Sequence, residues 1–221
     1  MKINDHLHAF LWRSMSANNC NTYLIDGPAR VLIDPGHLTL FDHVQSGLSD
    51  LGLEPKDMDL VICTHAHPDH IEAVQLFKKA SVVFALHKEE WELVQKMRRY
   101  MGPGMEQAID AMTPDLFLKQ GDLKVKDLTL EVYHTPGHSP GSVTLLWPEY
   151  KALFTGDVVF NQGIGRTDLP GGNGQQLKTS IKRLAELDVE MVLSGHGDMV
   201  SGAEAVARNF EHIEKVWFNY I

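Results

Sequence analysis

Thr64-His65-Ala66-His67-Pro68-Asp69-His70 is the stretch of this sequence that decides its fold and chemistry. It follows the apolar residues 60–63 and precedes an amphipathic segment, so it is predicted to be a turn from a strand into a helix. His65 and His67 are two residues apart and point to the same side of an extended backbone. Asp69 and His70 follow as the chain turns. Imidazole and carboxylate groups suit Zn²⁺, Fe or Mn²⁺, so we interpret the stretch as metal-binding rather than as a solvated polar turn.

Three further candidate ligands follow predicted strands in the second half of the chain. His138 lies in the loop Thr135-Pro136-Gly137-His138, Asp157 follows Gly156, and His196 lies between Gly195 and Gly197. Function in α/β sheets collects at strand ends, and glycine lets the backbone approach a metal closely. Together with the first stretch, these positions predict a metal centre with more ligands than a closed four-ligand site uses.

Short β-branched runs alternate with longer amphipathic segments along the whole chain. This alternation predicts two sheets with helices on their outer faces, in a single domain of residues 1–221. The apolar stripe of the last helix is interpreted as core, and residues 101–121 as a long excursion that could form a lid. The expected strands are 21–25, 31–34, 60–64, 81–86, 128–134, 142–147, 152–155 and 191–194, and the expected helices are 40–51, 71–79, 89–101, 175–187 and 203–220.

The composition of the chain limits the kinds of molecule that it is expected to bind. The 221 residues carry a formal charge of −9, which disfavours a broad surface for the phosphates of nucleic acid. The two cysteines cannot form a disulfide framework, and no stretch approaches the ~20 apolar residues of a membrane span. The N-terminal residues are too polar for a signal peptide. We therefore expect a cytoplasmic protein that acts on a small molecule, with neither nucleic acid nor membrane as partner.

The order of these motifs resembles the metallo-β-lactamase superfamily. The resemblance runs from residues 19–25 and Leu32-Ile33-Asp34-Pro35-Gly36 to His196. It implies a four-layer αβ/βα sandwich with two divalent metal ions, which we expect to be zinc, with iron or manganese as alternatives. By family position, the ligands of the first metal would be His65, His67 and His138, those of the second Asp69, His70 and His196, with Asp157 bridging.

Residues 160–172 resemble the glyoxalase II-like branch, which includes hydroxyacylglutathione hydrolases and persulfide dioxygenases. In glyoxalase II a lysine and a tyrosine contact glutathione where this chain has Arg166 and Asp168. Arg166 is therefore a candidate substrate-binding residue, and the alternative is an ion pair with Asp168 that stabilises the loop.

The resemblance implies hydrolysis of an acyl thioester, such as a hydroxyacylglutathione. Paired metals would lower the pKa of a shared water enough to supply a hydroxide that attacks the carbonyl. Asp69, besides ligating, would orient that hydroxide or carry its proton. A thiolate leaves readily, so no dedicated general acid is required.

Two other enzyme classes stay open. His65, His138 and Asp157 alone would form the mononuclear iron site of a persulfide dioxygenase. A lactonase or a β-lactamase-like hydrolase would share the metal motif.

Overall fold

The computed structural model describes residues 1–100 and 105–221, which form two compact units. The first comprises Met1–Leu118 and Lys124–Leu128, and the second comprises Lys119–Leu123 and Thr129–Ile221. Each unit has its own sheet and its own hydrophobic core.

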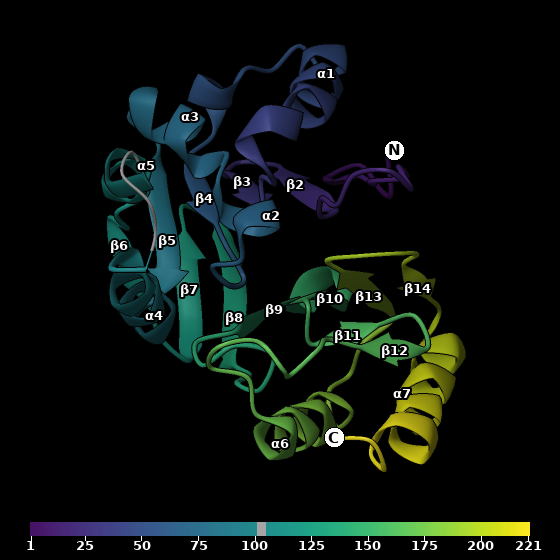
Figure 1. The fold of residues 1–221 in the computed structure, drawn as a ribbon. Helices are drawn as coiled ribbons and strands as arrows, with labels where there is room; N and C mark the ends of the chain where they lie inside the picture. Colours follow the sequence, from purple (N-terminus) through teal and green to yellow (C-terminus); the bar gives the residue numbers. More distant parts are fainter. Residues whose placement is uncertain (101–104) are drawn as a thin grey trace. The chain divides into compact units, whose positions relative to one another are not determined.

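The first unit is built on a six-stranded sheet of order β1-β2-β3-β4-β5-β6 (Figure 1). The first three strands are antiparallel, and β3 to β6 run parallel to one another. Parallel neighbours place their carboxyl ends at the same edge of a sheet. The strands are β1 (Leu7–Phe10), β2 (Thr22–Asp26), β3 (Arg30–Ile33), β4 (Leu60–Ile62), β5 (Val83–His87) and β6 (Leu116–Leu118).

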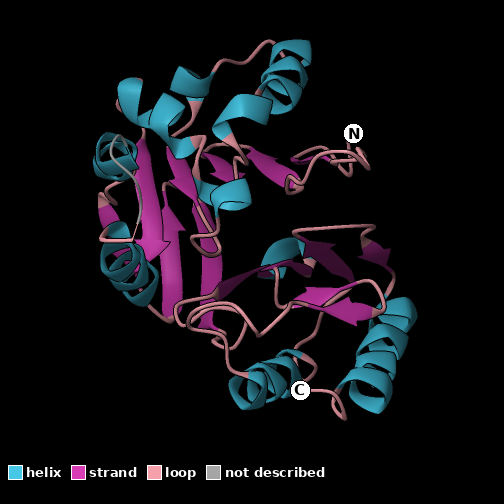
Figure 2. Cartoon of the chain, in the orientation of Figure 1, coloured by secondary structure: helices cyan, strands magenta, loops and turns pink. Residues whose placement is uncertain are grey.

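Helices of the first unit pack on this sheet through one apolar core. Val61 and Phe84 of the sheet contribute to the same buried cluster as Leu48 and Phe77 of the helices. In Figure 2 the strands are magenta and the helices cyan. The helices are α1 (Asp42–Asp50), α2 (Pro68–Ile71), α3 (Val74–Lys79), α4 (Lys88–Arg98) and α5 (Met105–Ala111), and the short 3-10 turns are η1 (Leu38–Leu40) and η2 (Pro55–Asp57).

The second unit contains a six-stranded sheet of order β14-β13-β10-β9-β8-β7 and a two-stranded hairpin. β10 and β13 are parallel, and β9 is antiparallel to both β8 and β10, so β8, β10 and β13 run in the same direction. The strands are β7 (Gly121–Val125), β8 (Leu128–His134), β9 (Val143–Trp147), β10 (Ala152–Gly156), β13 (Met191–Ser194) and β14 (Val200–Ser201), with β11 (Val159–Phe160) and β12 (Gly163–Ile164) in the hairpin and η3 (Pro148–Tyr150) between β9 and β10.

Two helices cover the second sheet. Leu177 and Ile181 of α6 (Gly174–Leu184) and Phe210 of α7 (Ala203–Trp217) belong to the same core as Leu153 and Val192 of the strands. No helix in residues 1–100 and 105–221 is long and apolar enough to span a membrane.

Strands β1, β7 and β14 and the hairpin of β11 and β12 were not expected from the sequence, and three segments that were interpreted differ from the expectation. The expected helix 71–79 is divided between α2 and α3, because the amide of Ala73 donates to the carbonyl of Gly36 at 2.8 Å instead of continuing the helix. Within the expected excursion 101–121, residues 105–121 contain α5 and the edge strand β6, and residues 101–104 lie outside the described part of the chain. The expected core stripe of the last helix ran on to Trp217 and Tyr220, and this was wrong, since they are 36% and 79% exposed. The helix ends at Trp217, so Tyr220 does not continue the helical face.

Candidate metal centre

Four of the predicted ligands gather at one edge of the first sheet. β3 ends at Ile33 and the parallel β4 ends at Ile62, so the residues that follow the two strands lie side by side. His65 and His67 occupy the loop after β4, and Asp69 and His70 occupy the short helix α2, which Pro68 begins. The sequence therefore predicted the local structure of this stretch correctly.

Asp34 links two of these histidines. Its carboxylate accepts hydrogen bonds from the amide of Thr64 at 2.7 Å and the hydroxyl of Thr64 at 2.8 Å, and it lies 3.0 Å from Nδ1 of His70. The Thr64 oxygen in turn lies 3.1 Å from Nδ1 of His65. Nδ1 of His65 makes this bond and Nδ1 of His70 lies against the Asp34 carboxylate, so Nε2 is the nitrogen of each ring oriented for a metal. Asp34 is thus a positioning residue for the ligands.

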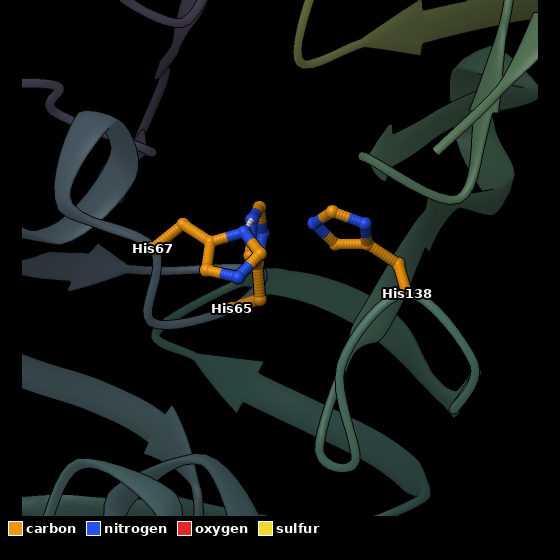
Figure 3. Close-up of side chains that lie close together, drawn as sticks. All are labelled: His65, His67 and His138. Atoms are coloured by element: carbon orange, nitrogen blue, oxygen red, sulfur yellow. Dashed lines mark hydrogen bonds between the residues drawn. The ribbon is translucent and has the colours of Figure 1, made fainter. Parts of the chain in front are cut away.

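The two histidines of the first pair face each other. Nε2 of His65 and Nδ1 of His67 are 3.1 Å apart, as the dashed line in Figure 3 indicates. Two nitrogens bound at about 2.0–2.1 Å to a tetrahedral zinc ion would lie about 3.3 Å apart. The pair therefore has the separation expected of two ligands of one ion.

Two partly buried polar contacts hold Asp69 of α2 and the loop before it. The side-chain amide of Asn18 donates to Oδ2 of Asp69 at 2.7 Å. Glu90 of α4 is only 1% exposed, and its carboxylate accepts the backbone amide of Ala66 at 2.8 Å. Since Ala66 separates His65 from His67, Glu90 fixes the backbone that carries the histidine pair.

The other three predicted ligands follow the three strands of the second sheet that run in the same direction. His138 lies after β8, Asp157 directly after β10 and His196 after β13. The carboxyl ends of these strands meet at one edge, which gathers side chains far apart in sequence. Figure 3 labels His138 in the loop after β8.

Oδ2 of Asp157 lies 3.7 Å from Nε2 of His138 and 3.4 Å from Nε2 of His196. This single oxygen of Asp157 is therefore close to one histidine that precedes it in the sequence, His138, and to one that follows it, His196.

The backbone of residues 165–166 approaches these ligands closely. Nδ1 of His138 donates to the carbonyl of Arg166 at 2.8 Å, which orients Nε2 for a metal. A side chain at Gly165 would place Cβ 1.8 Å from the carbonyl oxygen of Asp157 and 2.9 Å from Nδ1 of His138. Only glycine fits there.

The side chain of Arg166 forms an ion pair with Asp168, which was the alternative to substrate binding expected from the sequence. Nε and Nη2 each donate to a different carboxylate oxygen of Asp168 at 2.7 Å. The hydrogen bonds from Arg166 lower the pKa of Asp168 to about 2. Both side chains are exposed, at 60% and 68%, so the pair lies at the surface of the loop.

The chemistry of the donors fits metal ions. His65, Asp69, His70, His138 and Asp157 are all at most 9% exposed. Burying carboxylates and imidazoles together is costly unless a positive charge compensates for the lost hydration. All seven predicted ligands are side chains able to hold a metal ion. The structure brings four of them together in the first unit and three in the second.

A family model described as the metallo-beta-lactamase superfamily matches residues 15–201. The chain belongs to the metallo-β-lactamase superfamily. The match includes all seven candidate ligands, and the expected superfamily fold is confirmed. As a member of this superfamily, the chain is a metallo-hydrolase.

Two relatives are similar to this chain over most of its length. The chain is 36% identical over 197 residues to the probable metallo-hydrolase YqgX of Bacillus subtilis, covering 84% of this chain and 90% of that protein. It is 34% identical over 190 residues to hydroxyacylglutathione hydrolase GloC of Haemophilus influenzae, covering 81% and 85%. The chain is therefore similar to a member of the glyoxalase II-like branch over most of its length.

A solved superfamily structure is similar to this chain as well. It is described as TTHA1623 in a di-iron-bound form, with a TM-score of 0.69 and 30% sequence identity, and the alignment covers 89% of this chain and 96% of that one.

The supporting residues were not predicted. Asp34, Asn18 and Glu90 hold ligands or their loop, yet the sequence analysis gave them no role. The available signal was the position of Asp34 directly after an apolar strand and before Pro35-Gly36. Its left-handed φ of 54° indicates a tightly specified turn.

Proposed function

We propose that this protein hydrolyses an acyl thioester of the hydroxyacylglutathione type at a centre of two divalent metal ions. His65, His67 and His138 would hold the first ion, and Asp69, His70 and His196 the second, with Asp157 between them. The position of Oδ2 of Asp157 carries this proposal, since it lies near ring nitrogens assigned to different ions. The similarity to GloC supports the thioester class.

Bound divalent ions would supply Lewis acidity, lowering the pKa of water and polarising the carbonyl of the substrate. The protein's own groups have separate tasks. Asp34, Thr64 and the carbonyl of Arg166 hold the histidine rings in the orientation that exposes the ligating nitrogen. Asn18 holds one oxygen of Asp69, so this carboxylate has a fixed direction in which to orient the attacking water or accept its proton. A thiolate needs little assistance in leaving.

Metal content is the first measurement that tests the proposal. Anaerobically purified protein is expected to contain about two metal ions per chain by mass spectrometry, with zinc as the main species. Removal with a chelator should abolish hydrolysis of S-lactoylglutathione, and adding back zinc should restore it. One iron per chain, with oxygen consumption in the presence of glutathione persulfide, would contradict the hydrolase proposal and indicate a dioxygenase.

We also propose that Arg166 binds the anionic part of the substrate. Arg166→Ala should raise KM for a thioester with a carboxylated thiol carrier about tenfold, because the variant loses a charge-assisted hydrogen bond to that carboxylate. KM for a neutral thioester should change less than about twofold. The measurement is steady-state kinetics with both substrates.

Asp168→Ala is the matched control, since it removes the same ion pair but keeps the cation. If Arg166 acts only through that pair, the two variants should have equal KM values, and the substrate-binding proposal would be wrong.

The lowered pKa of Asp168 also determines how KM depends on pH. A carboxyl with a depressed pKa keeps its ion pair above that pKa and loses it only as pH falls toward about 2. The pair should therefore cause no change in KM between pH 5 and 9.

A further inference from the structure

The second unit contains a cavity of about 450 Å³ that none of the seven candidate ligands lines. One wall is a single face of α6, formed by Gln176, Thr179, Ser180 and Arg183, which follow the spacing of a helical face. The remaining lining residues are Gln120, His134, Pro136, Asn173 and Gln175. Small-molecule sites in proteins have volumes of roughly 300–1,000 Å³, so this cavity has room for a small metabolite.

Arg183 supplies the positive charge of the cavity. Nη1 donates to the side-chain oxygen of Gln120 at 3.1 Å, and Nη2 donates to the backbone carbonyl of His134. The guanidinium carbon lies 5.7 Å from the centre of the Tyr133 ring. These contacts fix the direction of the guanidinium group but involve only neutral partners.

The charge of Arg183 is not neutralised within the described part of the chain. Neither residues 1–100 nor residues 105–221 place a carboxylate in an ion pair with it, and the cavity lining contains no acidic residue. Nε is buried and has no hydrogen-bond acceptor among these residues. An arginine is always charged and presents a planar array of donors that matches carboxylate and phosphate groups.

The rest of the lining is suited to a polar anion. Asn173, Gln175 and Gln176 offer side-chain amides at the first turn of α6, where the helix dipole also favours negative charge. Thr179 and Ser180 lie on the same face, but their hydroxyls donate to the carbonyls of Gln175 and Pro136, so the donors left for an anion are the amide and guanidinium N–H groups. The cavity therefore combines one fixed cation with several neutral hydrogen-bonding groups, which is typical of a site for a small organic anion.

The cavity also adjoins the loop that carries His138. The hydroxyl of Ser180 donates to the carbonyl of Pro136 at 2.8 Å, and the amide of Asn173 donates to the carbonyl of Gly137 at 2.7 Å. Helix α6 and this loop are thus joined on both sides of the cavity.

We propose that this cavity is a second ligand site, distinct from the metal centre, that binds a small anion through a carboxylate or phosphate group on Arg183. Its wall includes Pro136, two residues before His138, so an occupant stabilises the loop that presents this ligand.

Binding of inorganic phosphate and of malonate to the metal-loaded protein tests the proposal. Isothermal titration calorimetry gives the affinity, and ¹⁵N–¹H spectra locate the perturbed amides, which should include those of Gln176 and Ser180. Binding of phosphate alone would identify a phosphate site, and binding of malonate alone a carboxylate site. Arg183→Gln should weaken the bound probe about tenfold or more. Lys182→Gln, which removes a neighbouring exposed charge of the same helix, should change the affinity less than about twofold.

Thr179→Tyr provides a second variant should Arg183→Gln prove unstable. Thr179 is exposed and its side chain lines the cavity, so a tyrosine fills the space without altering the charge. It should also weaken binding about tenfold. The proposal is overturned if neither probe binds, if Arg183→Gln and Lys182→Gln weaken binding equally, or if binding survives Thr179→Tyr and Arg183→Gln, which would place the probe on the metals. None of these readouts depends on thioester hydrolysis.

Discussion

His67→Ala is expected to reduce the metal content from about two ions per chain to about one and to lower kcat/KM for thioester hydrolysis about 100-fold or more. The expected loss exceeds the 10- to 100-fold typical of changes to residues that only support a ligand. His67 contributes Nδ1 to the pair with His65, 3.1 Å away, and alanine leaves nothing to replace that nitrogen. Metal analysis and steady-state kinetics on the same preparation provide the measurement.

Two comparison variants make this result interpretable. His65→Ala should lose metal whether the centre holds two ions or a single iron, because His65 is a ligand in both assignments. His212→Ala, which removes a histidine of α7 outside the ligand set, should retain both metal and activity. Full metal content and near-normal hydrolysis in His67→Ala would contradict the binuclear proposal.

Asp34→Asn is expected to lower the free energy of unfolding by about 3 kcal/mol and to weaken metal binding about 10- to 100-fold. The Asp34 side chain is 3% exposed, and its carboxylate serves the amide and hydroxyl of Thr64 as well as the ring of His70. An asparagine has a single acceptor oxygen and would direct an NH₂ group at one of these donors. Asparagine tolerates the left-handed φ of 54°, so the loss would not reflect backbone strain.

Chemical denaturation of the metal-free and metal-loaded forms would separate the two effects of Asp34→Asn. The loss of stability should persist without metal, because the bonds to Thr64 need none. Asp26→Asn is the matched control, since Asp26 pairs with Arg30 at a partly exposed site where an ion pair contributes at most about 1 kcal/mol. Equal losses in the two variants would contradict the role assigned to Asp34.

The candidate ligands could be predicted because each follows a short apolar strand, and five of the seven stand beside glycine or proline. The residues that hold them could not. Asp34 meets Thr64 across 30 residues of sequence and His70 across 36, and this pairing exists only because β3 and β4 are parallel neighbours. Glu90 has a similar explanation, since on the sequence alone it is one of several charged residues of an amphipathic helix, yet it is buried against the amide of Ala66.

Secondary structure was predictable where hydrophobic periodicity was strong and not elsewhere. β8 and β9 match the expected strands closely, and their inward residues are buried. β7 has the charged and largely exposed sequence Gly121–Val125, so pairing at the edge of the sheet rather than burial makes it a strand. The break between α2 and α3 depends on the carbonyl of Gly36, a distant partner that no local pattern reveals.

The crowding around Gly165 has a consequence for anyone who wishes to re-engineer this enzyme for new substrates. In a library that randomises this loop, many clones will carry a substitution at Gly165, where even alanine would collide with the backbone of Asp157. Asn161, in the turn before β12, and Arg166, directly after Gly165, have exposed side chains and no positive φ, so they impose no such limit. A library that diversifies these two positions and keeps the glycine fixed should therefore yield a higher fraction of folded, metal-binding clones than one that randomises residues 161–166 throughout.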